Sequence, residues 1–413
     1  LGLSLACQEN YGIHDSPISN PDTCVLPSGL KIKIPLVVCN IYCRCAHYQE
    51  GLDSQVRMVG IGGGEGVDDE VIAKPLTNQQ LKLRKDKAKA QKSRRDKANL
   101  AISGALHLPV HISNPNPHAK IQFFNKSFIC WADEKQTSII AVFKFHPFST
   151  MDPTLKERYQ VLSHHLIAQT AFQNPNKTNG PQYSGKMYSL GWRKGYESCS
   201  KIGIQGIAAK VACDPMGFKE LKNKVPVIHE FIGKRFQSVS VPLFEEVKKQ
   251  HNDLQAPALA PQFQPNPDGF TCHLSYTIGS FGNRPHKDTD ASPFSFVMWI
   301  PIEKDTGNIV DNHFQVKHGK FVFPDDLFGI NFSGFDGIVE CAWKATVYSH
   351  LTLPSHVPPH SSHTCMGLSC QLPKKTATAL EKIKNNFYDN HPTQGHYTIR
   401  DADKLLEDSK SYM

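Results

Sequence analysis

The sequence contains no run of about 18 or more uninterrupted apolar residues, the length that a membrane-spanning helix requires. Twelve cysteines in 413 residues are too few for a small disulfide-stabilised scaffold. The first residues lack the basic segment and the long apolar stretch of a secretory signal. These absences predict a soluble protein of a reducing compartment, the cytosol or the nucleus.

Glycine and proline number 28 each, which disfavours a long-helix architecture and favours a fold rich in turns and strands. Hydrophobic residues make up 39% of the chain and charged residues 20%, values typical of folded proteins. The length allows two or three domains, or one elaborated domain.

Positive charge is concentrated in one segment. Between Lys82 and Lys97 there are nine basic and two acidic residues, whereas the rest of the chain has 37 basic and 36 acidic residues. The segment from Thr77 through Ala105 has no Gly or Pro until Gly104, which favours a helix, and its cations lie on nearly every face. Such a helix could contact the phosphates of a nucleic acid or could simply be a solvated charged surface. The candidate DNA contacts are Lys82, Arg84, Lys85, Lys87, Lys89, Lys92, Arg94 and Arg95.

A group of cysteines lies in a predicted strand region between residues 29 and 49. Cys39, Cys43 and Cys45 share one face of an extended chain, and Cys24 and His47 could complete a zinc site. The alternative is a strand with a buried thiol-rich face, and the absence of a CxxC pair favours it.

The pattern of the remaining chain predicts an α+β fold. Helical patterns occur at residues 154–173, 202–212, 218–224 and 241–251, and β-branched or aromatic runs occur at 269–279, 294–302, 319–323, 337–349 and 364–372. Short strands at this spacing indicate a jelly roll, or double-stranded β-helix, flanked by helices. We expect an N-terminal extension with a strand region (1–73), a helical region with the basic helix (74–254), the β-helix core (255–373) and a C-terminal helical tail (374–413).

Three residues of the predicted core form a candidate metal site. Non-haem iron(II) that activates oxygen is held by two imidazoles and one carboxylate, which leave coordination positions open. His286 and Asp288 lie at i and i+2 of a strand end, and His350 follows a later strand. The pattern HxD also occurs at His251, but that copy has no strand beside it, so we interpret it as a helix end.

The core resembles a known family. His286-Lys-Asp288, Phe-Val-Phe-Pro-Asp-Asp (321–326), the run from Asp336 to Trp343, His350 and Met-Gly-Leu-Ser-Cys-Gln (366–371) are similar to the fungal branch of the TET/JBP dioxygenases. The resemblance implies an enzyme that uses Fe(II), 2-oxoglutarate and O₂ to oxidise methyl groups on DNA bases, with His286, Asp288 and His350 as metal ligands. It further implies oxidation of 5-methylcytosine to its hydroxymethyl, formyl and carboxyl forms, a double-stranded DNA partner, a nuclear location and flipping of the base out of the duplex.

One departure from the family concerns 2-oxoglutarate. Members usually carry an arginine for the distal carboxylate on the strand after the second histidine, but no Lys or Arg lies between Lys344 and Lys374, and Cys365 stands at that place. Arg284 is the nearest candidate cation, and His360, His363 and Thr364 are further candidate contacts.

A second departure concerns the base. Relatives that read methylcytosine often have Asn or Asp five residues after the first histidine, where this chain has Ala291. Asp290 and Asp336 are the candidate substrate contacts, and N6-methyladenine becomes a second candidate base. Two alternatives to a DNA-base dioxygenase remain open at this point. One is a hydroxylase of the same fold with a different substrate, and the other is a DNA-binding relative with an impaired iron site.

Overall fold

The computed structural model describes residues 23–25, 31–33, 86, 121–132, 138–176, 185–194, 202–391 and 399–413. The chain divides into two compact units, one made of Leu1–Ile41 with Ile121–Met413 and one made of Tyr42–Lys120. Of the second unit only Asp86, a helical and exposed residue, is described. The candidate DNA contacts from Lys82 to Arg95 lie outside the described residues, as do Cys39, Cys43, Cys45 and His47 of the candidate zinc site, of which only Cys24 falls in a described strand. Both sites stay predictions.

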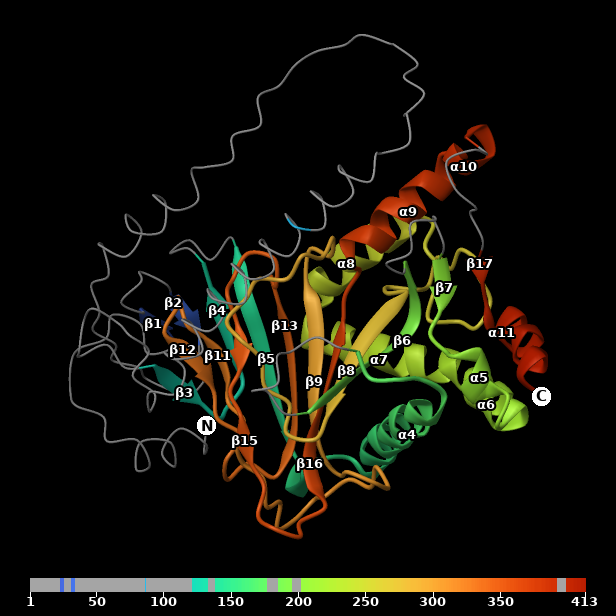
Figure 1. Cartoon of the computed structure of the whole chain (residues 1–413). Helices are drawn as coiled ribbons and strands as arrows, with labels where there is room; N and C mark the ends of the chain where they lie inside the picture. Colours follow the sequence, from blue (N-terminus) through green and yellow to red (C-terminus); the bar gives the residue numbers. More distant parts are fainter. Residues whose placement is uncertain are drawn as a thin grey trace, which may run out of the picture. The chain divides into compact units, whose positions relative to one another are not determined.

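A large sheet of eleven strands forms the centre of the first unit (Figure 1). Its strands, in spatial order, are β1 (Thr23–Val25), β2 (Lys31–Lys33), β4 (Phe128–Trp131), β5 (Ile139–Pro147), β13 (Gly337–Trp343), β9 (Ser295–Glu303), β16 (His363–Cys370), β8 (His273–Ile278), β6 (Lys186–Lys194), β7 (Ile202–Ile204) and β17 (Ile399–Arg400). All pairs in it are antiparallel except that of β7 with β17.

A smaller sheet packs against one face of the large sheet. Its order is β14 (Leu351–Thr352), β11 (Phe321–Phe323), β12 (Phe328–Ile330) and β3 (Gln122–Phe124). A separate pair is formed by β10 (Lys317–His318) and β15 (Ser355–His356). An apolar cluster joins the two sheets, with Trp299 and Trp343 from the large sheet and Phe321 and Phe328 from the smaller one. Two facing sheets whose strands pair mostly antiparallel make a jelly roll, as the sequence predicted.

Helices cover the other face of the large sheet (Figure 1). The helices of the described residues are α4 (Pro153–Gln169), α5 (Ala208–Val211), α6 (Pro215–Asn223), α7 (Val225–Val239), α8 (Val241–Asp253), α9 (Lys374–Lys384), α10 (Phe387–Asn390) and α11 (Ala402–Ser409), with single 3₁₀ turns at Phe148–Thr150, Thr170–Phe172 and Lys410–Tyr412. Residues of α4, α7 and α8 pack on the middle of the sheet, those of α5, α6, α9 and α11 pack with β6 and β7, and α10 has no buried residue. None of the helices in the described ranges is long and apolar enough to cross a membrane.

Local sequence explains both kinds of element. Helix α4 begins where the Asp152 side chain accepts a hydrogen bond from the Leu155 N–H, and Pro153 occupies the first turn. In β16 every second residue is buried, because Met366, Leu368 and Cys370 enter the core between the sheet and the helices. The opposite face of β16 is consequently half-buried and faces the side of the smaller sheet.

The region expected to be helical, residues 74–254, has a mixed structure. Strands β3 to β7 lie within it, and β4, β5, β6 and β7 extend the large sheet on both sides of the β-helix core. The helical pattern predicted for 202–212 is wrong at its start, because Ile202–Ile204 pairs as a strand with β6 and only Ala208–Val211 is helical. Residues 255–373 therefore do not form a sheet by themselves.

A buried ion pair ties the large sheet to its helices. Glu340 on β13 is fully buried, and Arg235 of α7 donates two hydrogen bonds of 2.8 Å to its two carboxylate oxygens. The Tyr159 hydroxyl of α4 donates at 2.5 Å, and His146 of β5 lies at 2.9 Å. Although burial opposes ionisation, the hydrogen bonds from His146 and Arg235 and their charges hold the pKa of Glu340 below its ordinary value. The network joins two strands and two helices through one charge.

Candidate metal centre

The main chain brings the two candidate histidine ligands side by side. The backbone N–H of His286 donates to the carbonyl of His350 at 3.1 Å, and the N–H of His350 donates to the carbonyl of His286 at 2.9 Å. The N–H of Asp288 donates to the carbonyl of Ala345 at 2.9 Å. This antiparallel bridge places the segment 286–288 next to β14, at the edge of the smaller sheet.

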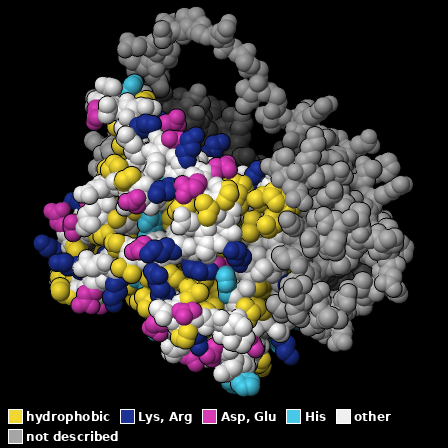
Figure 2. Space-filling model, turned by 180° about the vertical axis from the view of Figure 1, so that it is seen from behind, with side chains coloured by type: hydrophobic (Ala, Val, Ile, Leu, Met, Phe, Trp, Pro, Cys, Tyr) yellow, Lys and Arg dark blue, Asp and Glu magenta, His cyan; other side chains and the backbone are white. Residues whose placement is uncertain are grey.

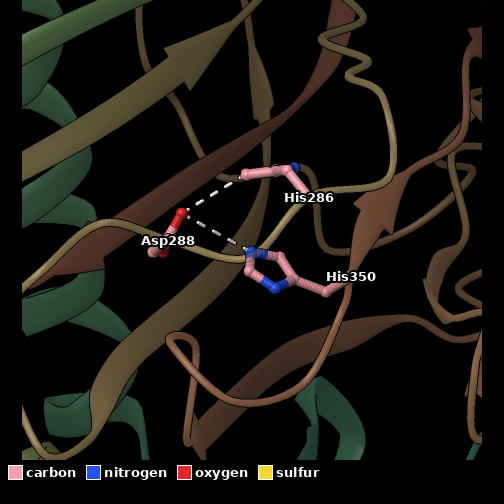
Figure 3. Close-up of side chains that lie close together, drawn as sticks. All are labelled: His286, Asp288 and His350. Atoms are coloured by element: carbon pink, nitrogen blue, oxygen red, sulfur yellow. Dashed lines mark ion pairs between the residues drawn. The ribbon is translucent and has the colours of Figure 1, made fainter. Parts of the chain in front are cut away.

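The side chains of the triad point toward one another (Figure 3). Oδ1 of Asp288 is 3.3 Å from Nε2 of His286 and 3.8 Å from Nε2 of His350, and one ligand atom from each residue lies within 4.8 Å of the others. Ligands about 2.1 Å from one metal ion, at right angles to each other, are roughly 3 Å apart. The triad therefore fits a small divalent cation, and no other such group of His, Cys, Asp and Glu occurs in the described part of the chain.

Backbone carbonyls set the orientation of both imidazole rings. Nδ1 of His286 lies 2.7 Å from the carbonyl oxygen of Arg284, and Nδ1 of His350 lies 3.1 Å from that of Tyr348. A carbonyl only accepts, so each Nδ1 carries a proton and, in the neutral ring, each Nε2 has the lone pair that would bind a metal. Two neutral imidazoles and one carboxylate on one face are the ligand set of non-haem iron(II) oxygenases.

The two histidines differ in their surroundings. His350 is 4% exposed, and its ring lies 5.3 Å from the Trp343 ring and 5.7 Å from the Phe321 ring, centroid to centroid. Burial lowers the pKa of His350, which keeps the ring neutral and able to bind a metal. The side chain of His286 is 39% exposed, and despite burial that opposes the charge, its hydrogen bond to Asp288 raises its pKa. The triad is therefore closed on the aromatic side and open on the side of His286.

The candidate contacts for 2-oxoglutarate occupy different environments. Cys365 packs against the aromatic cluster between the sheets, and burial raises the pKa of its thiol to about 12, so that it is neutral. Thr364 points to the opposite face, where its hydroxyl accepts from the N–H groups of Gly279 and Ser280 at 3.1 and 3.4 Å. The ring of His363 lies against Phe314 and accepts from the Gln315 N–H at 3.3 Å. Arg284 is half-buried, two residues before the first ligand.

The two candidate substrate carboxylates lie at different ends of the fold. Asp290 follows the ligand segment, forms a bridge with Pro373, and has its pKa raised to about 7 by burial and by the charge of Asp288. Asp336 precedes β13, whereas Trp343, whose ring touches His350, ends this strand seven residues later. A strand of that length spans roughly 20 Å. The structure thus places Asp290 beside the triad and does not bring Asp336 to it.

The second HxD copy is a packing histidine. His251 lies in the last turn of α8, is 4% exposed, and has its pKa lowered to about 4 by burial. Sequence reasoning missed Glu340 as the residue that ties the sheet to its helices. A single charged residue inside the apolar run of β13 was the signal for a buried ion pair, but the sequence did not identify its partners.

Comparison with known families agrees with this geometry. The model of the Tet-like 2OG-Fe(II) oxygenase superfamily matches residues 152–355, which include His286, Asp288 and His350. No curated protein matches the chain. The family accounts for the jelly-roll core, and it implies Fe(II) and 2-oxoglutarate as the metal and the co-substrate. Residues 152–355 of the chain therefore belong to the Tet-like 2OG-Fe(II) oxygenase superfamily.

Proposed function

We propose that this oxygenase oxidises methyl groups on the bases of double-stranded DNA. The observation that carries the proposal is the His286, Asp288 and His350 triad, with both Nε2 atoms available and one side open, in a chain of this family. Iron bound there, together with 2-oxoglutarate and O₂, would supply the oxidising power needed for a methyl C–H bond. The protein's part is to hold the ion, the co-substrate and the methyl group in a reactive geometry.

Different residues around the metal ligands have different roles in this arrangement. The carbonyls of Arg284 and Tyr348 hold the two rings in the metal-binding tautomer. The neutral thiol of Cys365 cannot neutralise a distal carboxylate, so we assign that role to the guanidinium of Arg284. The aromatic rings against His350 exclude water from the closed side of the triad.

The distribution of positive charge along the sequence supports DNA as the partner. The concentration of cations from Lys82 to Lys97 is suited to phosphate contacts. On the face of the described unit shown in Figure 2, by contrast, Lys and Arg side chains are interspersed with Asp and Glu. A methyl group inside a duplex is out of reach of a metal held between two sheets, so the base must leave the stack. A nuclear location and activity on 5-methylcytosine or N6-methyladenine belong to the same proposal.

Turnover with defined DNA tests the proposal. The protein is loaded with Fe(II), and succinate and oxidised nucleosides are measured by mass spectrometry with duplexes that contain 5-methylcytosine, N6-methyladenine or neither. We expect methyl oxidation and succinate formation that is faster with a methylated duplex. Succinate without any oxidised base would indicate a hydroxylase of another substrate. Absence of succinate with intact iron binding would indicate an impaired relative, for which the Cys365 position already gives a reason.

A further inference from the structure

Polar side chains line the sheet face on the same side as the triad. In β16 and β8 the residues that face the helices are apolar and buried, including Leu368 and Tyr276. The residues of the opposite parity include Ser275, Thr277, Gly367 and Ser369, which are half-buried, and His273, which is buried. Cys365, on this same face, packs in the aromatic cluster whose rings contact His350. The polar residues therefore lie on the same sheet face as the aromatic cluster that contacts His350.

Gln371 follows β16 and is anchored beside the ligand segment. The N–H of the next residue, Leu372, donates to Ser292 Oγ at 2.6 Å, and its carbonyl accepts from the Ala291 N–H at 2.8 Å. Pro373 forms a bridge with Asp290, two residues after the ligand Asp288. The position of Gln371 relative to the triad is thus set by main-chain hydrogen bonds on its C-terminal side and by strand pairing before it.

The carboxamide of Gln371 is only half satisfied. Its Nε2 donates to Ser275 Oγ at 3.4 Å, whereas its Oε1 is shielded from solvent and accepts no hydrogen bond from the described residues. Rotation of the amide by 180° exchanges the two atoms, and the Ser275 hydroxyl can donate as well as accept. In either orientation one polar atom of Gln371 stays without a partner. Buried polar atoms of this kind are rare in folded proteins and call for an explanation.

We propose that Gln371, oriented by Ser275, forms a subsite that hydrogen-bonds the polar edge of the substrate base. This inference rests on the proposed function and adds the residue that recognises the base. A base that has left the duplex exposes a row of donors and acceptors, and a carboxamide can pair with either kind. The amino group beside the methyl-bearing carbon of 5-methylcytosine, or the methylated amino group of N6-methyladenine, would donate to Oε1. Recognition by the amide would hold the methyl group near the metal without a charged side chain.

Two variants of Gln371 test whether its side chain is needed as a hydrogen-bond acceptor or only to fill space. Gln371→Leu removes both polar atoms, and we expect kcat/KM for oxidation of 5-methylcytosine in a duplex to fall roughly tenfold, as for loss of one or two neutral hydrogen bonds. Gln371→Glu keeps an acceptor, and we expect it to retain at least about three times the kcat/KM of the leucine variant. Gln262→Leu, a change of an exposed glutamine, is the matched control and should leave kcat/KM unchanged.

Succinate formed without DNA is measured for every variant, because it reports the folded iron site alone and should stay near the wild-type rate. If both Gln371 variants oxidise the base as fast as the wild type, the amide takes no part in base recognition and the inference is wrong, while the proposed function stands. If the leucine variant also loses DNA-independent succinate formation, Gln371 supports the iron site and the inference is equally wrong. If the wild type forms succinate but oxidises no base, the proposed function fails, and the subsite fails with it.

Discussion

Acid should destabilise this protein through a histidine that is buried as a neutral ring. His165 of α4 is 4% exposed, and neither of its ring nitrogens has a hydrogen-bond partner among the described residues. Burial, together with the positive charges of Lys222 and Lys224, lowers the pKa of His165 to about 3. The ordinary pKa of histidine, near 6.5, applies in the unfolded chain. Below about pH 6.5 the unfolded chain therefore binds a proton that the folded chain refuses until the pH approaches 3.

The sign and size of the effect follow from this difference. Where the unfolded state binds more protons than the folded state, the free energy of unfolding falls as the pH is lowered. The contribution of His165 to this free energy therefore decreases by about 1.4 kcal/mol for each pH unit below 6.5. Replacement by leucine removes the titrating ring and breaks no hydrogen bond. From about pH 7.5 to pH 5.5, we expect the stability of His165→Leu relative to the wild type to rise by about 1.4 kcal/mol.

Urea unfolding at several pH values measures this difference directly. The control is Ser163→Ala on the same helix, which removes a hydroxyl that donates to the Gly307 carbonyl at 2.7 Å. A hydroxyl does not titrate in this range, so the stability cost of the control should be the same at each pH. A stability difference between His165→Leu and the wild type that does not change with pH would refute the reasoning, because it would mean that the ring is protonated equally in the folded and unfolded chains.

Further expectations concern the iron site, the buried ion pair, the co-substrate and the basic segment. His350→Ala should abolish anaerobic Fe(II) binding, and retained iron affinity would exclude His350 as a ligand. Arg235→Leu should cost about 3–5 kcal/mol in urea unfolding, because it leaves the fully buried carboxylate of Glu340 without its cation; a cost below about 1 kcal/mol would show that the carboxyl is protonated there. Arg284→Ala should raise the KM for 2-oxoglutarate about ten- to a hundredfold through loss of a charge-assisted bond, and an unchanged KM would assign the carboxylate to other groups. Neutralising four cations between Lys82 and Lys97 should reduce the salt dependence of DNA binding by roughly 0.9 per lost contact, whereas an unchanged slope would indicate a solvated surface.

The fold class and the candidate metal ligands could be predicted from the sequence because both depend on local sequence patterns. Runs of β-branched and aromatic residues predicted the strands that became β9 and β16, and strands on both sides of His286 distinguished it from His251. The same local patterns gave a wrong prediction for residues 202–204, where the short strand β7, next to the edge strand β17, looks like the start of a helix. A three-residue run carries too little periodicity to separate the two.

The amino-acid sequence by itself determined which residues could bind a metal, which segments alternate as strands and where positive charge is concentrated. Only the tertiary structure decided that the polar atoms of Gln371 and Ser275 meet, and that Asp336 lies at the far end of β13. It also decided that the charge of Glu340 is held by Arg235 from a distant helix. The reason is that a local pattern specifies which face of a strand is buried, whereas strand order and register, fixed by the packing of the whole sheet, specify which side chains meet there.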